Sequence, residues 1–135
     1  MLAGGTLTAT SPIAQLELDI EGLRSAKGAV SVCLTTDPDH YPDCQNDPAA
    51  RRQKVAARAL RVIRFADVPS GTYAVALIHD ENGNNRLDTT LGVPREGVGF
   101  SRNPPLYFGP PRFARARFPV GNAAMAERIR VKYFL

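Results

Sequence analysis

Residues 15–34 read QLELDIEGLRSAKGAVSVCL, and this stretch decides the fold class. Polar and apolar residues alternate without a break over residues 15–21, and the alternation resumes over residues 29–34. A period of two is typical of β-strands that bury one face. The glycines that bound residues 22–28 favour a turn between the strands. The stretch therefore predicts a β-hairpin whose inward residues are Leu16, Leu18, Ile20, Val30, Val32 and Leu34.

Further strand-like runs follow at residues 60–65, 72–80, 118–120 and 128–133. The run at 72–80 is apolar on both faces, which is typical of a central strand. Residues 49–57 favour a short helical turn instead, because Ala, Arg, Gln and Lys tolerate helix well. These runs predict an all-β chain, a single antiparallel β-sandwich of about seven strands, with one long irregular loop region over residues 81–111.

The length of 135 residues is that of one domain. We expect the sandwich to occupy residues 13–135 and residues 1–12, rich in Gly, Thr, Ala and Ser, to form a flexible N-terminal segment. The first residues carry neither the basic region nor the apolar run of a signal peptide, so the chain is either cytosolic or exported with its signal removed. No apolar run is long enough for a transmembrane helix.

The formal net charge is +4, and arginines make up 14 of the 17 basic residues. The basic residues are spread along the chain and form no run. A preference for arginine over lysine is typical of proteins from GC-rich genomes as well as of proteins that bind anions. The sequence contains no nucleic-acid-binding motif. We therefore expect no nucleic-acid partner.

Two cysteines, Cys33 and Cys44, lie eleven positions apart. A disulfide between them would stabilise the fold by about 3 kcal/mol and would persist in an oxidising compartment. Two free thiols are the alternative. Zinc ligation by the pair is less favoured, because the nearest further ligand is His40 and zinc-binding cysteines are usually closer together.

A loop rich in Asp and Asn follows the central strand. Counted from Asp80, oxygen-bearing groups occupy alternate positions, which is the arrangement by which a tight loop surrounds Ca²⁺. The expected ligands are Asp80, Asn82, Asn84, Asp88 and the backbone carbonyl of Arg86. Asn85 occupies the sixth position, where such loops prefer Gly, and Asn tolerates the left-handed conformation needed there.

The loop departs from high-affinity calcium sites at its twelfth position, which is Leu91 rather than Glu. Glu96 is a more distant source of an extra oxygen. Any site is expected to be weak, with a dissociation constant of roughly 0.1 to 1 mM. The alternative is a metal-free loop closed by hydrogen bonds from its own Asx side chains to the backbone.

The run HDENGNNRLD at residues 79–88 is followed by LGVPREGVGFSRNP at residues 91–104 and by FGPPRF at residues 108–113. Upstream, residues 68–75 read VPSGTYAV, a Pro/Gly turn that leads into the central strand. This combination resembles the bacterial domain-of-unknown-function 2141 family over residues 14–135. The resemblance implies an exported protein with a β-sandwich of the transthyretin or carboxypeptidase-regulatory type, and export in turn supports the Cys33–Cys44 bridge. It implies no catalytic residues.

An exported binding module, with a weakly calcium-stabilised loop, is the leading functional hypothesis, because loops on a rigid sandwich are frequent recognition sites. The candidate ligand-binding residues are Phe100, Arg102, Asn103 and Tyr107. The expected partner of the binding module is an unidentified small ligand or an envelope protein. If these aromatic rings fold inward, they are core residues instead.

Two other functions remain open. An envelope structural or interaction domain would use a sheet edge or the basic face of Arg128, Arg130 and Lys132. A hydrolase would use His79 with a nearby carboxylate as acid and base. His79 shares the inward strand face with core residues, which favours a structural histidine, and the chain contains no common catalytic motif.

Overall fold

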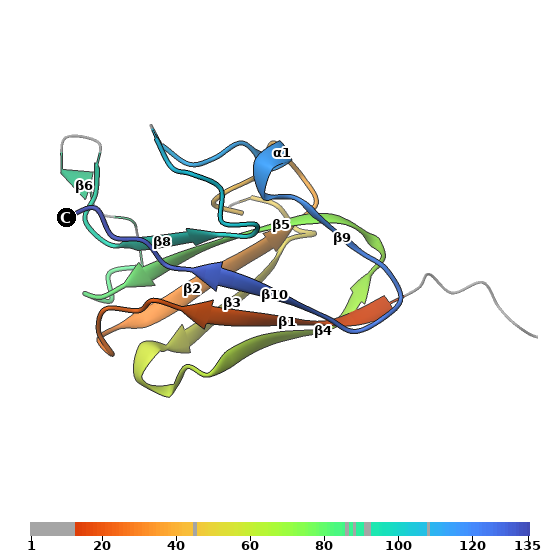
Figure 1. Ribbon diagram of the computed structural model, residues 1–135, viewed down its shortest axis with the longest axis horizontal. Coiled ribbons are helices and arrows are strands. Elements are labelled where there is room, and N and C mark those ends of the chain that lie inside the picture. The colour runs from red at the N-terminus through yellow and green to blue at the C-terminus, as the bar shows by residue number, and fades with distance from the viewer. Residues whose placement is uncertain (1–12, 45, 86, 88, 91–92, 108) are drawn as a thin grey trace, which may run out of the picture.

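The computed structural model describes residues 13–135 except 45, 86, 88, 91–92 and 108; the predicted flexible segment at 1–12 lies outside the described residues (Figure 1). The strands are β1 (Ile13–Glu21), β2 (Ala29–Thr35), β3 (Arg51–Ala56), β4 (Val62–Pro69), β5 (Gly71–Asp80), β6 (Thr89–Thr90), β7 (Val93–Pro94), β8 (Gly97–Phe100), β9 (Phe118–Val120) and β10 (Met125–Arg130). One 3-10 turn, η2 (Ala57–Ala59), and one short helix, α1 (Phe113–Ala116), complete the described elements.

The strands form two main sheets. One sheet has the order β10-β1-β4, and the other has the order β3-β2-β5-β8, with β9 also paired to β5. A small β6-β7 hairpin stands apart. All pairs are antiparallel except β1 with β10, which run parallel. The prediction of an all-β sandwich is confirmed, with ten strands in place of about seven.

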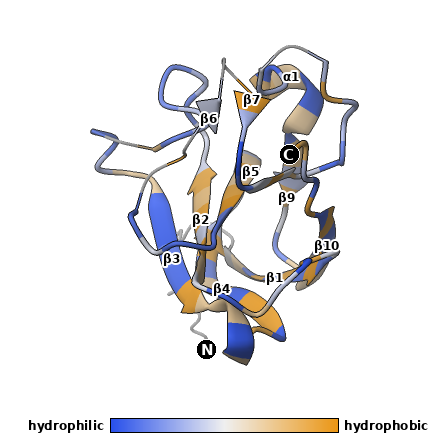
Figure 2. Cartoon of the chain, turned by 90° about the vertical axis from the view of Figure 1, so that its left-hand side faces the viewer, coloured by the Kyte–Doolittle hydropathy of each residue, from blue (hydrophilic) through white to orange (hydrophobic). Residues whose placement is uncertain are grey.

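The core lies between the two sheets. The three-stranded sheet contributes Leu16, Leu18, Ile63, Phe65 and Ile129, and the larger sheet contributes Val30, Val32, Leu34, Val75 and Leu77. These side chains come from alternate positions of their strands, so the predicted inward faces are confirmed. In Figure 2, β2 is largely hydrophobic, whereas β3 beside it is largely hydrophilic. No helix within the described residues is long and apolar enough to cross a membrane.

The predicted hairpin of the first two strands is wrong. β1 pairs with β4 and β10, whereas β2 pairs with β3 and β5. Packed sheets stand roughly 10 Å apart, and the seven residues at 22–28 are long enough to cross that gap, whereas a hairpin commonly needs two to five. Alternation identifies a strand and its inward face, but it does not identify the neighbouring strand.

The predicted helical turn at residues 49–57 is also wrong, because residues 51–56 form β3. β3 pairs with β2 along its whole length, from Ala29 opposite Ala56 to Leu34 opposite Arg51. Pairing with a buried strand outweighs a weak helix propensity. The polar residues of β3 suit an edge strand, which must resist pairing with other chains.

The predicted irregular region over residues 81–111 contains one strand of the main sheet. β8 pairs with β5, with Gly97 opposite His79 and Phe100 opposite Ala76. Two glycines in four residues hide this strand from a sequence pattern. They are needed there because the side chains of Tyr133, Val131 and Ile129 pack against the space that a Cβ at Gly97 or Gly99 would enter.

Candidate functional site

The loops gather at two opposite ends of the larger sheet. In the β2–β5 pair, Thr35 lies opposite Ala74 at one end and Ala29 lies opposite Asp80 at the other. We call the first end, with residues 36–44, 46–48 and 110–117, the disulfide end. The second end, with residues 22–28, 81–85, 87, 89–90, 93–96 and the C-terminus, is the Asp80 end.

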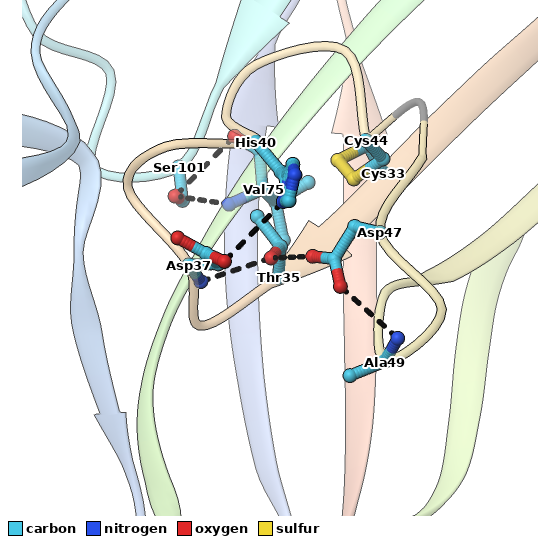
Figure 3. The surroundings of a disulfide bond; sticks show 9 residues. All are labelled: Cys33, Thr35, Asp37, His40, Cys44, Asp47, Ala49, Val75 and Ser101. Atoms are coloured by element: carbon cyan, nitrogen blue, oxygen red, sulfur yellow. Dashed lines mark hydrogen bonds and ion pairs between the residues drawn. A yellow bond between two sulfur atoms is a disulfide. The ribbon is translucent and has the colours of Figure 1, made fainter.

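A disulfide between Cys33 and Cys44 closes the loop of the disulfide end (Figure 3). The two Cα atoms are 5.9 Å apart, which is within the usual range for a bridge. Cys33 lies on the outer face of β2, and Cys44 is fully buried. The bridge therefore fastens the loop across the outside of the sheet, as the sequence predicted.

A polar cluster fills the inside of this loop. The Thr35 hydroxyl donates to Asp47 Oδ2 at 2.8 Å and accepts the Asp37 N–H at 3.0 Å. The N–H of Ala49 donates to the other oxygen of Asp47. His40 Nδ1 lies 3.3 Å from Asp37 Oδ2. The hydrogen bond from Thr35, above all, lowers the pKa of Asp47 from its ordinary value.

Three members of the polar cluster could hold a metal ion, since Asp37, His40 and Asp47 offer ligand atoms within 4.8 Å of one another. One imidazole and two carboxylates suit a zinc-like ion better than calcium. Hydrogen bonds within the loop account for the cluster equally well. The sequence did contain a signal, because Asp37 follows Cys33 by four residues and Asp47 follows Cys44 by three, so the bridge brings them together.

An open, largely apolar recess of about 540 Å³ lies beside this loop. Its walls are Pro38, Tyr41 and Pro42 on one side and Pro110, Pro111, Arg112, Phe113, Ala114 and Arg117 on the other. The Tyr41 ring makes edge contacts with Phe113, at a centroid distance of 5.7 Å, and with Phe100, at 6.3 Å. Sequence reasoning missed this recess, because its two walls are about 70 residues apart.

Tyr41 carries a polar group that the fold leaves unsatisfied. Its hydroxyl is buried and has no hydrogen-bond partner in the described part of the chain. Burial raises the pKa of Tyr41 above its ordinary value. Unpaired buried polar groups are few in native proteins, and each needs an explanation.

At the Asp80 end, Asp80 organises the loop that follows β5. Its side chain is buried, and its carboxylate accepts the N–H of Asn84 at 3.3 Å and the N–H of Asn85 at 2.7 Å. The N–H of Asn84 also donates to Asn82 Oδ1 at 3.2 Å. Asn85 has a φ of 64°, which confirms the predicted left-handed residue. The other two expected ligands, Arg86 and Asp88, lie outside the described residues.

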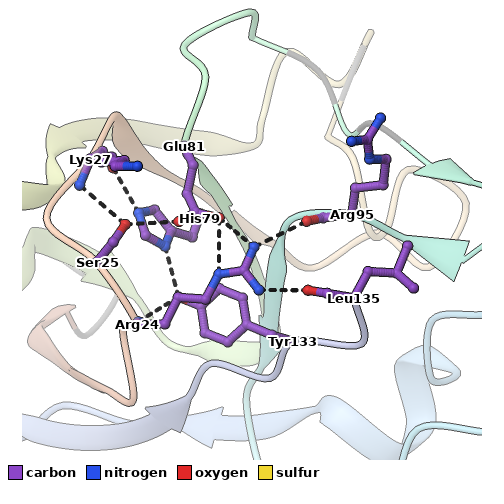
Figure 4. A network of polar contacts seen from close by, with 8 residues as sticks. All are labelled: Arg24, Ser25, Lys27, His79, Glu81, Arg95, Tyr133 and Leu135. Carbon is purple, nitrogen blue, oxygen red and sulfur yellow. Dashed lines mark hydrogen bonds and ion pairs between the residues drawn. The ribbon is translucent and has the colours of Figure 1, made fainter.

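His79 is fully buried beside this loop, and both of its ring nitrogens are engaged (Figure 4). Nε2 lies 2.8 Å from the carbonyl of Lys27 and therefore carries the proton, so Nδ1 accepts from the Tyr133 hydroxyl at 2.7 Å. The same hydroxyl accepts the N–H of Arg24 at 3.1 Å. A general base needs a lone pair that faces the substrate, and His79 has none to offer.

Arg24 and Glu81 connect the C-terminus to the start of the loop. The Arg24 guanidinium donates to Glu81 Oε1 at 2.6 Å, to the carbonyl of Leu135 at 2.6 Å, and stacks 4.4 Å from the centre of the Tyr133 ring. Ser25 donates to the second Glu81 oxygen at 2.8 Å. The hydrogen bond from Arg24 lowers the pKa of Glu81 below its ordinary value. The hydrogen bond from Ser25 lowers it further, by a smaller amount.

The four predicted ligand-binding residues do not gather at one place. Phe100 is buried in β8, where it contacts Tyr41. The side chain of Asn103 binds the backbone of β10, accepting the Arg130 N–H at 2.8 Å and donating to a carbonyl. Arg102 is exposed, and Tyr107 is 81% exposed. None of these four residues lines the recess of the disulfide end.

The remaining predicted groups occupy separate surroundings. Glu96 is buried within the loop that precedes β8. Arg128 and Arg130 on the basic face pair with Glu21, at 3.7 Å and 3.1 Å, and both side chains are well exposed. Exposed pairs of this kind are common on solvated sheet faces.

The model of one protein family, described as an uncharacterized protein conserved in bacteria (DUF2141), matches residues 18–128 of this chain. No curated protein and no solved structure matches it. The match spans most of the sandwich, from β1 to β10, and includes both the disulfide loop and the loop at Asp80. The chain belongs to the DUF2141 family of uncharacterised bacterial proteins.

Proposed function

We propose that this domain is an exported binding module whose ligand occupies the recess of the disulfide end. The recess itself carries the proposal. Its volume of about 540 Å³ falls in the range of roughly 300 to 1,000 Å³ found for small-molecule sites, and its lining is mostly apolar with a few polar groups. Proline and aromatic rings supply flat apolar walls at little cost in side-chain entropy.

The way the recess is built also supports binding. One wall is the loop that the Cys33–Cys44 disulfide fastens to β2, and the other wall includes α1. The end of α1 is tied to the sheet through Ser101, whose hydroxyl donates to the carbonyl of Ala116 at 2.5 Å and accepts the N–H of Val75 at 2.9 Å. Walls held in this way lose little freedom on binding, which favours affinity.

Export is supported by the same disulfide. Structural disulfides persist in oxidising compartments and are rare in the reducing cytosol. The bridge lies in a short loop with a buried Cys44, as expected for a structural rather than a redox-active bridge. A free-thiol assay on denatured, unreduced protein from its native host should find no titratable thiol; two thiols would contradict export.

The binding test uses N-phenylnaphthylamine, a neutral aromatic probe that fluoresces more strongly in apolar surroundings. We expect saturable binding to the wild type and its loss in Ala114→Trp, which fills the recess from its exposed wall. Ala124→Trp, in an exposed turn away from the recess, is the matched control. The chain contains no Trp, so the new indole also reports folding. Absence of saturable binding, or equal binding in both variants, contradicts the proposal.

We further propose that the loop beginning at Asp80 binds Ca²⁺ weakly. Two observations support it: the left-handed conformation of Asn85 at the sixth position, and the inward Asp80 carboxylate at the first. At calcium concentrations about tenfold above the dissociation constant, a specific site stabilises the native state by about 1.4 kcal/mol. Calorimetric scans should therefore show a higher Tm in calcium than in chelator, an effect reduced in Asn84→Ala. Identical scans would refute a calcium site.

A further inference from the structure

The recess has two cations on its exposed wall. Arg112 precedes α1 and Arg117 follows it, and both line the recess. Both residues are exposed, and neither has an ion-pair partner among the residues that the structure describes. Four other described arginines do have such partners, among them Arg24 with Glu81 and Arg64 with Glu17, whereas the exposed Arg115 of α1 has none among the described residues. The charge of this wall is therefore left uncompensated by the protein.

None of the described residues that line the recess carries a carboxylate. Asp37, next to Pro38, points into the polar cluster and lies 3.3 Å from His40 (Figure 3). Asp47 likewise faces Thr35. Asp39 and Asp43 also adjoin wall residues in the sequence and are exposed, but neither lines the recess. The charged side chains among the described lining residues are therefore both cations.

We propose that the recess selects amphipathic anions: small molecules with a flat apolar body and a carboxylate, sulfonate or phosphate head group. This inference rests on the proposed function, because it names the class of ligand for the same recess. The body lies against the rings of Tyr41, Phe113 and the four prolines, and the head group pairs with Arg112 and Arg117. A guanidinium group can donate two parallel N–H bonds to two oxygens of such a head group.

The unpaired hydroxyl of Tyr41 supports this inference from a second direction. It is a donor with no acceptor in the described part of the chain, and it belongs to a residue of the recess wall. An anionic head group offers several acceptor oxygens, whereas a purely apolar ligand offers none. A ligand oxygen that reaches this hydroxyl would satisfy a buried donor, beside the two guanidinium groups that also lack a partner in the described chain.

The test compares two probes that differ in charge and otherwise share their rings. Anilinonaphthalene sulfonate carries the anionic group, and N-phenylnaphthylamine lacks it. We expect the sulfonate to bind the wild type about tenfold more tightly, an advantage that shrinks as salt is added. Arg112→Met combined with Arg117→Met should remove most of that advantage while changing neutral-probe binding less than about twofold. Arg115→Met, an exposed arginine of α1 outside the recess lining, is the matched control.

The outcomes separate the two proposals. If neither probe binds saturably, the recess is not a ligand site and the proposed function fails. If both probes bind with equal affinity, or if Arg115→Met has the same effect as the double variant, the recess binds ligands without selecting anions and only this inference fails. Competition identifies the body: naphthoate should displace the sulfonate better than octanoate, and the reverse order would overturn the assignment of a flat body.

Discussion

The two ends of the sandwich hold their loops by different means. At the disulfide end, a covalent bridge fixes a loop in which Asp37 and Asp47 join a polar cluster and Tyr41 forms part of a recess wall. At the Asp80 end, hydrogen bonds tie the loop to the C-terminus through His79, Tyr133, Arg24 and Glu81 (Figure 4). One end is fixed by a crosslink and the other by a network of polar contacts.

The two ends also differ in how far their polar groups are satisfied, which bears on the proposed ligand site. Around His79, both ring nitrogens, the Tyr133 hydroxyl and both Glu81 oxygens have hydrogen-bond partners within the protein. Around the recess, the Tyr41 hydroxyl and two guanidinium groups have no partner in the described chain. The unsatisfied groups beside the recess therefore support the proposed ligand site, whereas the satisfied network at the Asp80 end fits a structural role.

Removal of the disulfide should have the largest effect. Cys33→Ala with Cys44→Ala is expected to lower the free energy of unfolding by about 3 kcal/mol, because the open chain regains the loop entropy that the bridge removes. It should also weaken probe binding, since one recess wall loses its anchor. Urea unfolding of the variant, and of the wild type with and without reductant, measures the loss. A loss below about 1 kcal/mol would show that the polar cluster suffices to hold the loop.

The next largest effect is expected from His79, whose replacement should lower the free energy of unfolding more than replacement of His40. His79→Leu leaves the Lys27 carbonyl and the Tyr133 hydroxyl without their partner in a buried setting, at a cost of about 2 kcal/mol. His40→Leu, at the disulfide end, removes one 3.3 Å contact from a side chain that is 33% exposed and should cost less than about 1 kcal/mol. Chemical unfolding compares them, and equal losses would contradict the contrast between the ends.

Much of the fold was predictable from local pattern. Alternation identified the inward residues of β1, β2 and β5, because burial of one strand face depends only on a period of two. It could not predict that β1 and β2 belong to different sheets, since strand pairing depends on residues far apart in the sequence. The edge strand β3 was missed for the same reason. Its own residues show no strand pattern, and its conformation depends on pairing with β2.

The site was less predictable than the fold. The Cys33–Cys44 bridge and the left-handed Asn85 were predicted because each follows from near neighbours in the sequence. Phe100 was predicted to be a ligand-binding residue. The pairing of β8 with β5 instead buries its ring, which packs against Tyr41. The recess joins residues 38–42 to residues 110–117, and no local pattern relates those two segments.

The ion pair at the Asp80 end should produce a smaller, pH-dependent effect. The pKa of Glu81 is lowered in the folded state, so its contribution is fully present above the ordinary value of 4.5 and is lost as the pH falls through the folded pKa. Glu81→Gln should cost about 1 kcal/mol at neutral pH and less in acid. Thermal unfolding across acidic pH measures this dependence. Glu17→Gln, which removes an exposed pair with Arg64, is the control and should change little.

The smallest change in stability is expected from the recess. Tyr41→Phe deletes a buried hydroxyl that has no partner in the described chain, so the free energy of unfolding without ligand should stay the same or rise by up to about 0.5 kcal/mol. Tyr133→Phe is its counterpart at the Asp80 end and should lose about 1 kcal/mol, because that hydroxyl serves His79 and Arg24. Only Tyr41→Phe should weaken binding of the anionic probe, by about two- to fivefold. Urea unfolding and probe titration of both variants provide the measurements. If Tyr41→Phe destabilises the free protein as much as Tyr133→Phe does, the Tyr41 hydroxyl has a partner within the fold, and only the two guanidinium groups then remain to favour an anionic ligand.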